Sequence, residues 1–184
     1  MSVRQAALAV LACMSIAGCA EFGELISFGD DEERAAALAQ AEQGRLWEMT
    51  LMAGRYGVML GQAREILNLP EPKQLAGEGF PSDAPGDAKQ REALAAYQAS
   101  VAAEFLSDVD SACKRKRVKP SLRKLACEQL AKAPADLRAP VKPEMQALAL
   151  RNDQVGEFIM PWWDAVCATV PKPKGDEMPV CIME

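Results

Sequence analysis

The residues most able to carry chemistry in this chain are its cysteines, since it contains six of them and no histidine. The lack of imidazole excludes histidine-based acid and base catalysis, the usual partner of a catalytic serine or cysteine, and the commonest metal ligand. No C-x-x-C pair occurs, so a zinc ion would need four widely scattered thiolates. We therefore expect no metal site and no cofactor, and the role of the cysteines depends on the compartment.

A second pattern with catalytic precedent is S-x-x-K at Ser121 to Lys124, which matches the serine and lysine of penicillin-binding proteins and class A β-lactamases. The accompanying S-D-N and K-T-G motifs do not occur, and a serine before a helix is an ordinary N-cap. The 26 acidic residues include no pair that a surrounding motif marks for hydrolysis. We expect no enzymatic activity, and a carboxylate-dependent hydrolase stays as one alternative.

The N-terminus has the pattern of an export signal. Arg4 supplies a positive charge, residues 6–14 form an apolar segment too short to span a bilayer, and the segment leads to Ile16-Ala17-Gly18-Cys19. These four residues resemble the lipobox of bacterial lipoproteins. The resemblance covers residues 1–18 and Cys19 only, and it implies cleavage before Cys19 and lipid attachment to its thiol.

The same resemblance sets the expected domain organisation and location. Residues 1–18 would be a cleaved signal, residues 19–29 a lipidated cysteine and tether, and residues 30–184 a single periplasmic domain. Ala20-Glu21 follows the lipidated cysteine where an aspartate often signals inner-membrane retention, which favours the outer membrane. The domain is acidic, so we expect no nucleic-acid partner.

Four cysteines remain for disulfides in an oxidising periplasm: Cys113, Cys127, Cys167 and Cys181. Three connectivities are possible. We favour Cys113 with Cys127 and Cys167 with Cys181, because both separations are 14 residues and each bond would join neighbouring segments. A redox or metal site is the alternative.

The elements that position these residues are predicted to be helices. Alanine occurs 32 times against 18 Val, Ile and Thr residues together, and this balance favours an all-α fold. Proline-rich segments at 70–86 and 134–143 separate about four helices, the first of them long, and an irregular tail after Pro171 would be joined to the last helix by a disulfide. The predicted helices cover residues 30–68, 87–117, 122–133, and a segment from Pro143 that Pro161 ends or kinks.

Two features suggest contacts with a partner protein. Ala53, Gly57 and Gly61 recur four residues apart beside Met52, which predicts close approach of another helix of this chain or of a second chain. Trp162 and Trp163 are adjacent, so on a helix they point about 100° apart. We expect one of them to be partly exposed, as an anchor for a partner or at the rim of the core.

A cationic run stands out in this acidic chain: Lys114, Arg115, Lys116, Arg117 and Lys119. These residues are candidates for binding anionic lipid headgroups, lipopolysaccharide phosphates or an acidic partner. The alternative is that they offset a helix dipole and solvate a turn.

The sequence predicts a lipid-anchored envelope protein that acts as a non-enzymatic interaction or scaffold module. An inhibitor or regulator of a periplasmic or cell-wall enzyme is the first alternative, and the hydrolase is the second. The expected partners are the bilayer, through Cys19, and another envelope protein, with the oligomeric state left open.

Overall fold

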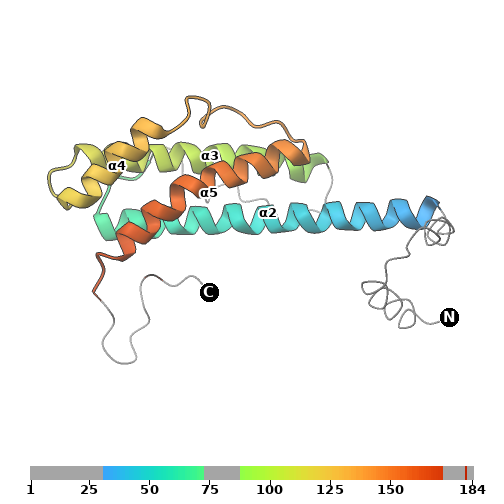
Figure 1. Ribbon diagram of the computed structural model, residues 1–184, viewed down its shortest axis with the longest axis horizontal. Helices are drawn as coiled ribbons and strands as arrows, with labels where there is room; N and C mark the ends of the chain where they lie inside the picture. The colour runs from blue at the N-terminus through green and yellow to red at the C-terminus, as the bar shows by residue number, and fades with distance from the viewer. Residues whose placement is uncertain (1–30, 73–87, 172–180, 182–184) are drawn as a thin grey trace, which may run out of the picture. The chain divides into compact units, whose positions relative to one another are not determined.

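A computed structural model describes residues 31–72, 88–171 and 181 (Figure 1). The predicted signal, Cys19 and the tether up to residue 29 lie outside the described residues, as does most of the 70–86 segment. Within the described part every regular element is a helix, so the predicted all-α fold with a long first helix is confirmed. The helices are α2 (Asp31–Leu67), α3 (Ala88–Lys114), α4 (Pro120–Lys132) and α5 (Met145–Cys167).

The chain divides into two compact units, residues 1–41 and 42–184. In the first unit the structure describes only the opening turns of α2, where the side chains of residues 32–41 are all exposed. The second unit contains the rest of α2, the other three helices and the described hydrophobic core.

Helix α2 ends at a left-handed residue. Asn68 has φ 48°, a conformation that asparagine tolerates better than most side chains. The Leu69 N–H then reaches back 3.0 Å to the Arg64 carbonyl, and the Asn68 N–H lies 3.1 Å from the Glu65 carbonyl. This pair of bonds is a Schellman motif, which satisfies carbonyls at the helix end. The helix end was predicted here from the prolines that follow. The left-handed conformation of Asn68 is what ends the helix locally.

Side chains from all four described helices form the core of the second unit. One face of α2 is buried along most of its length in this unit, at Leu46, Met49, Ala53, Tyr56, Leu60 and Ala63. Phe105 of α3 packs against Phe158 of α5 with ring centroids 6.1 Å apart. Gln98 of α3 is buried and donates from Nε2 to the Leu148 carbonyl of α5 at 3.0 Å. Buried contacts therefore hold α5 against α3.

The prediction for the start of α4 was wrong in one respect. Lys119 occupies the N-cap position and Pro120 the first turn, with no side-chain hydrogen bond capping the helix. Ser121 therefore lies inside the first turn and does not cap it. Proline is favoured there because its fixed φ suits a helix and its missing N–H would be unpaired in any case.

Helix α5 continues through Pro161, and both tryptophans that follow are buried. Trp162 is 0% and Trp163 3% exposed, so the expectation that one is partly exposed was wrong. Helix α5 packs against both α3 and α4, and its Gly156 lies against Tyr56 of α2. Two side chains 100° apart are both covered because the helix has neighbours on several sides, and neither is a surface anchor.

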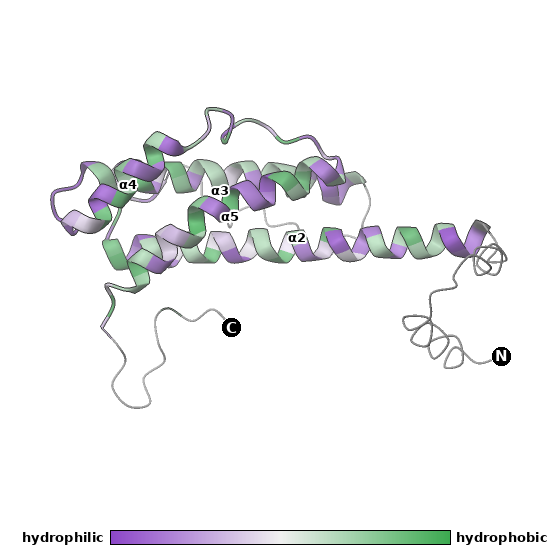
Figure 2. Ribbon diagram, in the orientation of Figure 1, coloured by the Kyte–Doolittle hydropathy of each residue, from purple (hydrophilic) through white to green (hydrophobic). Residues whose placement is uncertain are grey.

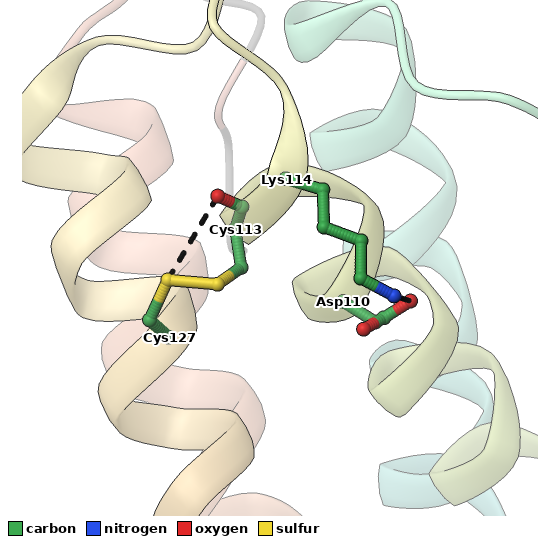
Figure 3. The surroundings of a disulfide bond; sticks show 4 residues. All are labelled: Asp110, Cys113, Lys114 and Cys127. Carbon is green, nitrogen blue, oxygen red and sulfur yellow. Dashed lines mark hydrogen bonds and ion pairs between the residues drawn. A yellow bond between two sulfur atoms is a disulfide. The ribbon is translucent and has the colours of Figure 1, made fainter.

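Both favoured disulfides are present. Cys113 at the end of α3 is bonded to Cys127 of α4, and Cys167 at the end of α5 is bonded to Cys181, which confirms the predicted pairing. Figure 3 shows the first bond between the two helices, with the Cys127 sulfur 3.8 Å from the Cys113 carbonyl oxygen. None of the helices described here carries an apolar stretch long enough to cross a bilayer.

Candidate interaction site

Helix α2 is apolar on a second face, opposite its buried stripe. Trp47, Leu51 and Val58 are 49%, 42% and 60% exposed. Steps of four and seven residues return nearly to the same side of a helix, so these three side chains share one outward face. Figure 2 shows hydrophobic residues recurring along α2. Exposed large apolar side chains gathered on one helix face mark an interaction site more often than scattered ones do.

Glycines are interspersed with the large residues on this face. The six positions follow one another at steps of three, four, three, four and three residues: Gly44, Trp47, Leu51, Gly54, Val58 and Gly61. We call these six residues the outer seam of α2. Steps of this kind average 3.5 residues, the repeat by which one helix packs lengthwise against another. A Cβ atom added at Gly44 or Gly61 would meet nothing within 4 Å, so both positions are open.

The predicted small-residue face is divided between two environments. Ala53 is 1% exposed and belongs to the core, whereas Met52 and Gly57 are half-buried. The open space at Gly61 shows that none of the other described helices approaches closely there, so of the two alternatives the packing within the chain is not seen for Gly61. A spacing of four rotates about 40° per step around the helix, so these residues do not stay on one face, whereas the seam does.

A cavity of about 450 Å³ lies beside the seam and ends on a buried ion-pair cluster. Gly57, Gly61, Arg64 and Glu104 are among the residues that line it. The Arg64 guanidinium forms an ion pair with Glu104. It also donates two hydrogen bonds to Asp108, from Nε to Oδ1 at 3.2 Å and from Nη2 to Oδ2 at 3.1 Å. All three side chains are buried, and together they join the end of α2 to α3.

The cluster holds two carboxylates against one cation, which controls its protonation. Burial raises the pKa of Asp108 to about 6, since desolvation and the nearby Glu104 outweigh the opposing effect of Arg64. Burial alone would lower the pKa of Arg64, but its hydrogen bonds to Asp108 and Glu104 raise it. Asp108 is 1% exposed, whereas its partners Arg64 and Glu104 line the cavity. The cluster is a structural link between helices.

Glu104 and Asp108 were not predicted as a pair from the sequence, although a signal for their burial was present. Glu104 and Asp108 are four residues apart on the helix that carries the apolar positions Val101, Phe105 and Val109. At 100° per residue Asp108 points only about 60° from Phe105, so it had to be buried with that stripe. A buried carboxylate requires a cation, but nothing local indicated Arg64 as the partner.

The cationic run is divided by the fold. Lys114 Nζ lies 2.7 Å from Asp110 Oδ2, as Figure 3 shows, and Arg115 donates a hydrogen bond to the Asn68 carbonyl at the end of α2. Three further cations are exposed: Lys116, Arg117 and Lys119. Two of the five candidate residues are therefore tied to neighbours, and three are available to an anion.

The other candidate chemistry finds no geometric support in the described residues. Ser121 and Lys124 are both exposed, and Lys124 Nζ lies 3.8 Å from Glu128, one turn further along α4 and away from the serine. No group of three acidic, cysteine or histidine side chains in the described ranges is placed to hold a metal ion.

No family model matches this chain, and comparisons with curated proteins and with solved structures return no match.

Proposed function

We propose that this protein is a non-enzymatic interaction module of the bacterial envelope, anchored by lipid on Cys19, which binds a protein partner through the outer seam of α2. The observation that carries the proposal is the exposure of Trp47, Leu51 and Val58 on one helix face. Large apolar side chains on a rigid element supply contact area at little cost in conformational entropy.

The location comes from the lipobox pattern and is supported by the two disulfides, which form in oxidising compartments. Replacement of Cys19 by serine tests the anchor. We expect Cys19→Ser to abolish metabolic fatty-acid labelling and to release the chain from the membrane fraction. Persistent labelling of the variant would refute the lipoprotein assignment.

In-cell crosslinking tests the binding face. We expect crosslinked products of the parent chain to disappear in Val58→Glu, because a charge at the centre of the seam opposes burial against an apolar partner. Leu150→Glu is the matched control, since Leu150 of α5 is also 60% exposed but lies on another helix. Equal crosslinking by both variants would reject the seam as the binding face.

A second candidate function, inhibition or regulation of an envelope enzyme, is favoured by the turn between α3 and α4. The Val118 side chain is buried, its N–H lies 3.2 Å from the Arg115 carbonyl, and the Cys113–Cys127 bond closes the turn from both sides. The result is a constrained turn with exposed cations, the form in which inhibitory loops present their contacts. Loss of partner inhibition on Arg117→Glu, but not on Val58→Glu, would favour this function over the first.

A further inference from the structure

We infer that the outer seam of α2 binds the same seam of a second copy of this chain, with the two helices antiparallel. The inference rests on the proposed function, because it names the partner of the same face. Its basis is a self-complementary order of large, small and charged residues along the seam.

The first observation is the order of large and small residues. Two identical antiparallel helices are related by a twofold axis. A seam residue of one helix then faces the seam residue of the other helix that lies equally far from the axis along the sequence, on its other side. With the axis between Leu51 and Gly54, Leu51 of each copy faces Gly54 of the other, and Trp47 faces Val58. Gly44 faces Gly61 at the two ends, where both positions are open. The largest side chains thus meet smaller ones, and the glycines allow the backbones to approach closely.

The second observation is the charge beside the seam. Glu48 and Arg55 are exposed on one flank of α2, about 80–100° from Trp47 at 100° per residue. Neither makes an ion pair with another residue in the part of the chain that the structure describes. A twofold axis perpendicular to the helices brings equal flanks together, so Glu48 of each copy meets Arg55 of the other. Two ion pairs would form in one dimer.

The charges select the antiparallel arrangement over the parallel one. In a parallel pair the flank with Glu48 and Arg55 meets the opposite flank of the other helix, where Gln43, Thr50 and Gly57 lie. No ion pair forms there. A parallel pair also places Trp47 against Trp47 and Gly54 against Gly54 in the middle of the seam. In the antiparallel pair glycine faces glycine only at the two ends.

Sedimentation equilibrium of the full chain in detergent micelles tests the inference. We expect a dimer whose dissociation constant rises about 100-fold in Val58→Glu, because the change buries a charge in an apolar seam. Leu150→Glu should leave the dissociation constant unchanged. Both positions are 60% exposed in the single chain, so unchanged far-UV circular dichroism of each variant separates lost association from lost folding.

Charge reversal tests the antiparallel register. Glu48→Arg places two cations opposite each other at both sites, and Arg55→Glu places two anions there, so each variant should dimerise about tenfold more weakly. A mixture of the two variants restores both ion pairs and should form heterodimers in preference to either homodimer. A parallel pair predicts no such preference, and its absence would overturn the antiparallel arrangement.

Other outcomes overturn the inference while separating it from the proposed function. A chain that stays monomeric, yet loses a crosslink to a different protein in Val58→Glu cells, would refute self-association and keep the proposed face. Shielding of Trp47 from a quencher by phospholipid vesicles, with the chain monomeric, would assign the seam to the bilayer. If Val58→Glu changes neither self-association nor crosslinking, the inference and the proposed function both fail.

Discussion

Arg64 of α2 and Asp108 of α3 form a bidentate ion pair in the core, 44 residues apart in the sequence, with Asp108 only 1% exposed. Glu104 joins the same guanidinium, so the cluster carries one excess negative charge when both acids are ionised. Burying such a cluster costs desolvation free energy. Removing one partner is destabilising because the remaining buried charge is no longer compensated.

Asp108 should make stability depend on pH in a defined window. Its pKa is about 6 in the fold against an ordinary 3.8, so the folded chain binds the proton more tightly than the unfolded chain does. This contribution is fully present below pH 4 and is lost as the pH rises to about 6. Asp108→Asn removes the titration, so the variant should gain stability relative to the parent between pH 4 and pH 7, measured by urea unfolding. Asp110→Asn, at a half-buried site on the same helix, is the control for the substitution itself.

Gly156 should be required for the contact between α5 and α2. A Cβ atom there would collide with the Tyr56 hydroxyl, and Tyr56 is 5% exposed and cannot swing away freely. We expect Gly156→Ala to lower the free energy of unfolding by about 1–3 kcal/mol through overpacking. Gly61→Ala, where the added Cβ meets nothing, should instead raise it by about 0.5–1 kcal/mol. Denaturation at concentrations where the chain is monomeric measures both, and equal effects would contradict the predicted contact.

The Cys113–Cys127 bond should stabilise the chain by closing a short loop. In the chain-entropy model a loop of 14 residues contributes about 3 kcal/mol, so the Cys113→Ala/Cys127→Ala double variant should lose roughly that amount. The readout is the unfolding midpoint without reductant. Adding reductant to the double variant should remove only the contribution of Cys167–Cys181. A double variant as stable as the parent would show that packing of α4 alone holds the turn.

Both tyrosines of the chain should ionise at a higher pH than a solvent-exposed tyrosine does. Burial raises the pKa of Tyr97 to about 12 and also raises that of Tyr56, with smaller contributions from Glu104 and Asp153. Ultraviolet titration of the folded chain should therefore show phenolate absorbance only well above pH 10, the ordinary value. The urea-unfolded chain supplies the control and should titrate near 10. Because the folded state keeps these protons, stability should fall as the pH rises past 10.

Much of the local structure could be predicted from short stretches of sequence. The high alanine content and the positions of Pro70, Pro120 and Pro143 indicated four helices and most of their ends, because backbone propensity and proline geometry act within a few residues. Equal separations of 14 residues identified both disulfides, since closing a short loop needs little knowledge of the fold.

The tertiary structure decided which side of each helix meets another. Helix α2 is apolar on two faces, and periodicity alone did not show that the face with Trp47, Leu51 and Val58 is an exposed one. Trp162 and Trp163 are both buried because α5 has neighbours on several sides, a condition no local pattern contains. The pairing of Arg64 with Asp108 likewise depends on how α2 and α3 are aligned along their lengths, which places the two side chains side by side. Propensity acts through adjacent residues, whereas burial and ion pairing depend on segments that only folding brings together.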